Sequence, residues 1–126
     1  MVKNLHWDHI MESKNITENK SFEFAVRIVN LYRYLLSKNE FVLSKQMVRS
    51  GTSIGANVSE AQRAQSIADF RSKMNIALKE ANETLYWLRL LNRTEYLSDQ
   101  EFHSIEKDLR EILALLTAIC KSTENK

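Results

Sequence analysis

Proline is absent from this 126-residue sequence, and glycine occurs only at Gly51 and Gly55. These two residue types mark most tight turns, so their scarcity argues against a fold built from many short β-strands. It favours long helices, because few residues interrupt them. With 44% hydrophobic and 27% charged residues, the composition is that of a globular protein. The sequence therefore predicts a single all-α domain.

Cysteine occurs once, at Cys120, which excludes an intramolecular disulfide and a zinc site built from several thiols. His6 and His9 are three residues apart, as two metal ligands on one helix can be, but no third ligand accompanies them. Glu80 and Glu83 lack the Glu-x-x-His partners of a di-metal bundle site, because this motif occurs nowhere in the chain. We expect no metal and no cofactor, and a reducing cytoplasm is the simplest location.

Long apolar runs are also missing. Residues 1–20 lack the continuous apolar core of a signal peptide, and no run approaches the roughly 18 apolar residues of a membrane span. The two glycines lack the Gly-Lys-Ser/Thr ending of a phosphate-binding loop, and no pairing of a nucleophile with a base stands out. We therefore expect no membrane partner and no enzymatic activity.

Neither sign of charge dominates the sequence, since the formal net charge is only +2. Its distribution is uneven. Residues 20–97 carry twelve basic and seven acidic side chains, whereas residues 98–126 carry four basic and six acidic ones. This asymmetry permits a modest basic surface on the middle of the chain, although such an imbalance is also typical of ordinary solvated surface.

Four stretches carry apolar residues at the three-and-four spacing of amphipathic helices. The expected helices span residues 21–37, 41–64, 67–93 and 99–121. Ser21 and Ser66 are expected N-caps, and Ser98 with Glu101 has the spacing of a capping box. We expect one four-helix-bundle domain over residues 20–121, with a flexible leader at residues 1–19 and a frayed tail at residues 122–126.

Small and aromatic residues indicate how these helices pack. Each glycine in the interior of the expected helix 41–64 costs about 1 kcal/mol relative to alanine, so we interpret Gly51 and Gly55 as a face that lets another helix approach closely. Tyr86 and Trp87 lie beside the apolar stripe of helix 67–93 and are predicted packing or interface anchors. Helix 21–37 is apolar on more than one face, which indicates a bundle that self-associates.

Several phrases of the sequence resemble a known family. They are RSGTSIGANV at residues 49–58, EAQ at residues 60–62, DF at residues 69–70, IALKEANET at residues 76–84 and YWL at residues 86–88. The chain resembles, over residues 22–120, the four-helix-bundle proteins encoded in intervening sequences of bacterial 23S ribosomal RNA genes. The resemblance implies an up-and-down antiparallel bundle that assembles into a ring-shaped homopentamer, without established enzymatic activity. The family is similar to accessory proteins of diversity-generating retroelements, which present basic surface to nucleic acid and to a reverse transcriptase.

Two functions remain open at this point. The first is a non-enzymatic, homo-oligomeric scaffold that binds RNA or DNA through a modest basic surface on the first three helices. The second is a protein–protein interaction module without nucleic-acid binding, which an apolar patch left exposed after self-assembly favours. The candidate nucleic-acid contacts are Arg27, Arg33, Lys45, Arg49, Arg63, Arg71, Lys73, Arg89 and Arg93. The alternative for each of them is an ordinary solvated charge, and some are expected to pair with Glu60, Glu80 or Glu83, above all Arg49, which lies near the glycine face.

Overall fold

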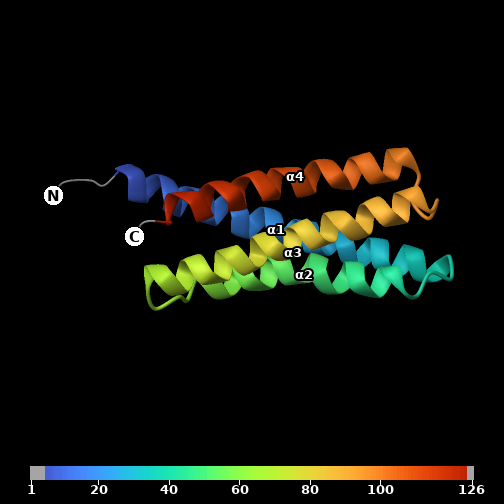
Figure 1. The fold of residues 1–126 in the computed structure, drawn as a ribbon, viewed down its shortest axis with the longest axis horizontal. Helices are drawn as coiled ribbons and strands as arrows, with labels where there is room; N and C mark the ends of the chain where they lie inside the picture. The colour runs from blue at the N-terminus through green and yellow to red at the C-terminus, as the bar shows by residue number, and fades with distance from the viewer. Residues whose placement is uncertain (1–4, 125–126) are drawn as a thin grey trace.

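The computed structural model describes residues 5–124, with side chains from residue 8 onward. Four α-helices make up the fold: α1 (Leu5–Ser37), α2 (Leu43–Ala61), α3 (Ile67–Arg93) and α4 (Asp99–Ser122). Consecutive helices run in opposite directions along one long axis (Figure 1). Both α1 and α3 contact α2 and α4, so the four helices enclose one core. The predicted all-α four-helix bundle is confirmed, and the described residues contain no β-strand.

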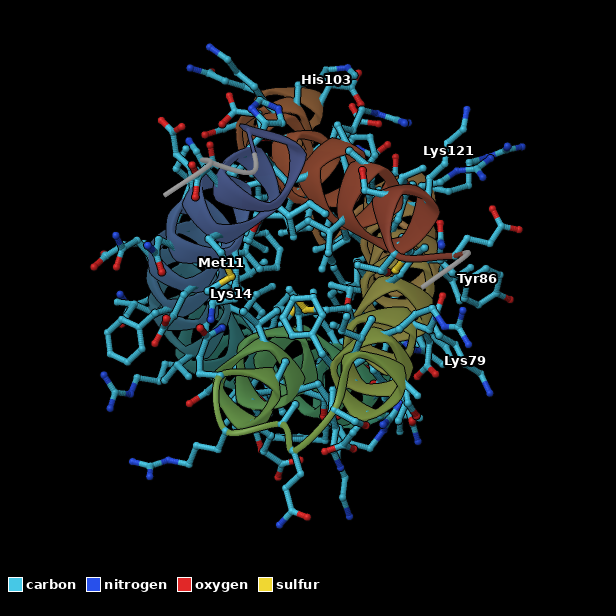
Figure 2. The ribbon with its side chains drawn as sticks, turned by 90° about the vertical axis from the view of Figure 1, so that its left-hand side faces the viewer. Met11, Lys14, Lys79, Tyr86, His103 and Lys121 are labelled. Atoms are coloured by element: carbon cyan, nitrogen blue, oxygen red, sulfur yellow. The ribbon has the colours of Figure 1, made fainter. Side chains whose placement is uncertain are left out.

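The interior of the bundle is filled by apolar side chains from all four helices (Figure 2). One polar contact crosses it, since the hydroxyl of Thr84 on α3 donates to the hydroxyl of Ser50 on α2 over 2.9 Å. Every buried side-chain nitrogen or oxygen among the described residues has a hydrogen-bond partner, so burial leaves no polar group unsatisfied there. The largest fully buried side chains are Phe24, Ile10, Ile28, Leu35, Met47, Ile54, Met74, Leu88, Leu91, Leu97, Leu109 and Ile112.

The start of α1 corrects the expected flexible leader. The helix begins at Leu5 rather than at residue 21, and Ile10 and Thr17 are buried. Ser21, expected as an N-cap, lies inside the helix and donates to the carbonyl oxygen of Glu18. The core stripe of α1 therefore continues toward the N-terminus, but polar residues occupy several of its positions and hide the periodicity. Residues 1–4 of the expected leader lie outside the described residues.

The second helix is shorter than expected, because a side chain sets its start. The carboxylate of Glu40 accepts hydrogen bonds from the backbone N–H groups of Val42, Leu43 and Ser44, at 3.2, 2.8 and 2.6 Å. These are donors that a helix N-terminus leaves without an intrahelical partner. The helix begins at Leu43 instead of residue 41 and ends at Ala61 instead of residue 64.

The last two helices begin directly after their expected N-cap residues, Ser66 and Ser98. Ser66 accepts from the N–H of Asp69, and Ser98 and Glu101 form both hydrogen bonds of a capping box. Helix α3 has the expected bounds, and α4 ends one residue beyond the expected position. Thr123, expected in the frayed tail, is instead fully buried and donates to the carbonyl oxygen of Ile119 over 3.0 Å. Residues 125–126 lie outside the described residues.

Both glycines lie where α2 approaches α1. A Cβ atom at Gly51 would lie 2.8 Å from Cγ2 of Ile28, and one at Gly55 would lie 3.2 Å from the carbonyl oxygen of Ser21. These separations are shorter than ordinary van der Waals contacts, so a larger side chain would push the two helices apart. The expected close approach of a neighbouring helix therefore occurs within the bundle.

Candidate nucleic-acid interface

The nine candidate cations differ in whether a carboxylate already neutralises them. Arg49 on α2 lies between two glutamates of α3, with Nη1 at 3.2 Å from Oε2 of Glu80 and Nη2 bonded to Oε2 of Glu83. The indole N–H of Trp87 donates to the same oxygen of Glu83 over 3.0 Å. The hydrogen bond with Glu83 raises the pKa of Arg49. The hydrogen bond from Trp87, together with the one from Arg49, lowers the pKa of Glu83. The ion pairs of Arg49 thus join α2 to α3, and Trp87 holds the carboxylate of Glu83 from within α3.

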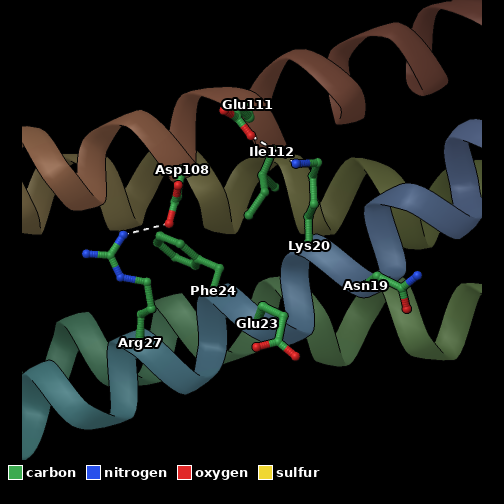
Figure 3. A pocket seen from close by; sticks show the side chains of 8 residues that line it. All are labelled: Asn19, Lys20, Glu23, Phe24, Arg27, Asp108, Glu111 and Ile112. Carbon is green, nitrogen blue, oxygen red and sulfur yellow. Dashed lines mark hydrogen bonds and ion pairs between the residues drawn. The ribbon is translucent and has the colours of Figure 1, made fainter.

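Arg27 on α1 is bound to α4. Its guanidinium lies 2.6 Å from a carboxylate oxygen of Asp108 and donates to both the carbonyl and the hydroxyl oxygen of Ser104. About two turns earlier on α1, Lys20 pairs with Glu111 over 3.0 Å. Figure 3 shows the ring of Phe24 between these two ion pairs, in a groove of about 350 Å³ between the helices. The charge of Arg27 is therefore engaged within the protomer.

Two further candidates also have partners. Arg71 on α3 donates to the carbonyl oxygens of Thr123 and Glu124, at 3.4 and 2.5 Å, and so holds the end of α4. Lys73 lies 3.4 Å from a carboxylate oxygen of Glu60 on α2. Like Arg27 and Arg49, these side chains connect neighbouring helices, which reduces their availability for phosphate groups.

The other five candidates are exposed and form no ion pair with any described residue: Arg33, Lys45, Arg63, Arg89 and Arg93. Arg63 lies in the turn between α2 and α3. The other four lie toward the opposite end of the bundle, where α1 turns into α2 and α3 turns into α4 (Figure 1). Four of the five candidate cations without an ion pair among the described residues therefore lie toward this end.

One groove at this end combines cations with an aromatic ring. It has a volume of about 420 Å³. Tyr86 on its wall is 57% exposed, and its ring packs against Trp87 in a T-shaped arrangement with centroids 5.0 Å apart. The lining residues come from α3 and α4 and are Tyr86, Arg89, Leu90, Asn92, Arg93, Phe102 and Glu106.

Glu106 is the one carboxylate in that lining, and it has two basic partners on α4. Arg110 donates to it through Nε and Nη2 at 3.1 and 2.9 Å, and Nδ1 of His103 lies 3.2 Å away. The hydrogen bond from Arg110, followed by that from His103, lowers the pKa of Glu106. The sequence analysis missed this residue, although the i, i+4 spacing of Glu106 and Arg110 predicts their pairing.

Apolar residues are exposed on another face. Phe22 on α1 is 66% exposed and Val26 is 42% exposed. Phe22 lines a groove of about 520 Å³ between α1 and α2, whose α2 side consists of Thr52, Gly55, Ala56 and Ser59. We call this feature the α1–α2 groove. Its α1 side also includes Glu18 and Glu23, so the groove is apolar with an acidic edge.

Two pairs of residues, His6 with His9 and Glu80 with Glu83, have the spacing of metal ligands, although no metal is expected. Glu80 and Glu83 both face Arg49, and the side chain of His6 lies outside the described residues. Within the part of the chain that the structure describes, no three His, Cys, Asp or Glu side chains are grouped closely enough to hold a metal ion. Burial raises the pKa of the Cys120 thiol, as for a small hydrophobic residue of the core edge. No described helix is both long enough and apolar enough to cross a membrane.

Comparison with known proteins identifies the family. The model of the 23S rRNA-intervening sequence proteins matches residues 13–118, which include parts of all four helices. The chain belongs to this family. It is also similar to a crystal structure of a protein of unknown function from the S23 ribosomal protein family of Bacteroides thetaiotaomicron, with 60% sequence identity and a TM-score of 0.85. That match covers 86% of this chain and 98% of the other. Comparison with curated proteins gave no match.

Family membership confirms the resemblance inferred from residues 49–88. The matched region of the 23S rRNA-intervening sequence proteins begins within α1, at residue 13. It therefore includes a helical segment that the sequence analysis assigned to a flexible leader. It also includes the whole groove between Tyr86 and Glu106.

Proposed function

We propose that this protein is a non-enzymatic, homo-oligomeric scaffold that binds the phosphate backbone of RNA or DNA. The observation that carries the proposal is the set of exposed cations without an ion pair among the described residues, four of which lie toward one end of the bundle. Each single contact with a phosphate is weak, but an oligomer repeats the set and multiplies the attraction. The lone Cys120 suits a reducing compartment, so we propose a cytoplasmic location.

Self-association is supported by the exposed apolar residues of α1. Phe22 and Val26 are exposed in the protomer although they are apolar. An exposed apolar patch with a polar edge is typical of a protein–protein contact. We propose a homopentamer, as the family resemblance implies. Light scattering after gel filtration is then expected to give five times the protomer mass of 14.7 kDa, and a mass near that of one protomer would contradict the proposal.

Nucleic-acid binding is tested by fluorescence anisotropy with labelled RNA and DNA, single-stranded and duplex, at three salt concentrations. The double variant Arg33→Gln/Arg89→Gln is expected to bind more weakly and to lower the salt slope by about one to two, because two phosphate contacts are lost. Lys107→Gln/Lys121→Gln removes two exposed charges of α4 and serves as the matched control. Equal slopes for the wild type and the first variant would contradict the proposal.

A protein–protein interaction module is the second candidate function. Phe41 and Val42, between α1 and α2, are 58% and 73% exposed and give the tip of the bundle an apolar character. This observation favours a protein partner at the same end as the exposed cations. Absence of nucleic-acid binding at the lowest salt concentration would favour this candidate over the first.

A further inference from the structure

The groove between Tyr86 and Glu106 contains an aromatic ring that other side chains of the protein cover only in part. The T-shaped contact with Trp87 covers at most one face of the Tyr86 ring, since in this arrangement one ring meets the other edge-on. Tyr86 is 57% exposed, although it lies two turns before the end of α3 and not at a frayed terminus. At least one face of the ring is therefore not covered by Trp87.

The cations of the groove are arranged along the same helix. Arg89 and Arg93 follow Tyr86 at i+3 and i+7, which places all three on one side of α3. The two arginines are one turn apart, or about 6 Å along the helix axis. Neither forms an ion pair with a described residue. Two guanidinium groups are thus available beside the ring.

The carboxylate that lines the opposite wall of the groove is already paired with a cation. Glu106 is bonded to Arg110, so its charge is balanced on α4 itself. Leu90 and Phe102 contribute apolar surface between the two helices, and the side-chain amide of Asn92 donates to the carbonyl oxygen of Leu97 and to Asp99. The groove therefore offers an aromatic face, apolar surface and a net excess of cations.

From this arrangement we infer that the Tyr86 groove binds single-stranded nucleic acid, with an unstacked base on the Tyr86 ring and adjacent phosphates on Arg89 and Arg93. The inference rests on the proposed function and specifies its ligand. An aromatic side chain accepts the π-face of any base, and arginines follow the backbone, so binding has little sequence preference. A duplex keeps its base faces stacked inside the helix and can use the arginines only.

The test uses anisotropy with a short labelled single strand, as DNA and as RNA, and with a duplex of the same sequence. Tyr86→Leu is expected to weaken single-strand binding about 5-fold or more, because the stacked base loses its platform. Tyr86→Phe retains the ring and is expected to stay within about 2-fold of the wild type. Neither variant is expected to change duplex binding. Circular dichroism checks that the helical content is unchanged.

The charge contribution is tested by Arg89→Gln/Arg93→Gln. Its matched control is Arg33→Gln/Lys45→Gln, which removes two exposed charges from α1 and α2 at the same end of the bundle. The first pair is expected to weaken single-strand binding more than the second pair does.

The outcomes separate this inference from the proposed function. A wild-type protein that binds single strands while Tyr86→Leu binds them equally well would overturn the inference and leave the proposed function intact. Equal losses for the two charge pairs would do the same, because they indicate a diffuse surface. A wild-type protein that binds neither single strands nor duplexes at the lowest salt would refute the proposed function itself.

Discussion

The carboxylate of Glu40 occupies the start of α2 and is buried there. Burial alone raises the pKa of a carboxyl group, but the hydrogen bonds from Leu43, Ser44 and Val42 outweigh it and lower the pKa of Glu40 below its ordinary value of 4.5. The folded state therefore binds the proton less tightly than the unfolded state. Its contribution to stability is present above about pH 4.5 and is lost as the pH falls through the lower, folded pKa.

Replacement of this residue tests the argument. We expect Glu40→Gln to lower the free energy of unfolding by about 1 kcal/mol near neutral pH, because the N-terminal amides lose a charged acceptor. The difference from the wild type is expected to shrink as the pH falls below about 4.5. Urea unfolding at a series of pH values measures it, with Glu12→Gln, an exposed carboxylate of α1, as the control. A difference that persists unchanged into acid would contradict the assignment.

Single residues also mark the limit of what the sequence predicts. The candidate cations were found by residue type, and pairing with Glu60, Glu80 or Glu83 was expected for some of them, above all for Arg49. The partners of Arg27 and Arg71 were not expected, because they are far away in the sequence. Arg49 and Glu83 are 34 positions apart in the sequence, and Arg27 and Asp108 are 81 positions apart. Only the packing of neighbouring helices brings such residues together. The spacing within one helix, as for Tyr86 and Arg89, was accessible from the sequence, whereas the opposite wall of their groove was not.

At the scale of elements, the N-terminal part of α1 packs as part of the bundle. Ile10 is 2% exposed, and Lys14 places its ammonium over the ring of Phe70, 5.9 Å from the centroid. Met11 and Lys14 line a groove with residues from the turn between α2 and α3. This segment therefore packs against the far end of α2 and the beginning of α3.

We expect Ile10→Ala to lower the free energy of unfolding by about 2 kcal/mol, because it leaves a cavity in this contact. Ile16→Ala removes the same atoms from the same segment at a position that is 41% exposed, and its effect is expected to stay within about 0.5 kcal/mol. Urea denaturation of both variants gives the comparison. Equal stability of the two variants would mean that the segment does not contribute to the core.

The sequence indicates the starts of some helices better than those of others, for a physical reason. Helices α3 and α4 have serine caps, and a continuous apolar stripe follows each cap, so their starts were visible. In α1 the core stripe passes through Lys14, Thr17 and Ser21, which read as polar surface. Thr17 nevertheless satisfies its hydroxyl by donating to the carbonyl oxygen of Ser13 over 2.6 Å. A polar residue that bonds to its own helix can be buried without a distant partner.

At the scale of the whole molecule, the α1–α2 groove is the proposed site of self-association. We expect Phe22→Glu to reduce the mass in light scattering to that of a 14.7 kDa protomer, because it introduces a charge at an apolar contact that already has an acidic edge. Val42→Glu changes another exposed apolar residue outside the groove and is expected to leave the mass unchanged. Because Phe22 is 66% exposed, its replacement does not disturb the core.

An unchanged mass for Phe22→Glu would contradict the use of this groove in assembly. A loss of mass for both variants would instead point to a contact at the tip of the bundle, near Val42. Circular dichroism of both variants distinguishes dissociation from unfolding, since a dissociated protomer keeps its helices.

In a bundle with an even number of antiparallel helices, the start of the first helix and the end of the last helix lie at the same end (Figure 1). The beginning of α1 and the end of α4 therefore lie away from the turn between α3 and α4, beside which Arg93 is located. A fluorophore, an affinity tag or a fused enzyme attached at either end of the chain would project away from the Tyr86 groove. Immobilised by such a tag, each protomer would present the groove to the solution, which makes the protein suited to surface-based measurements of strand capture.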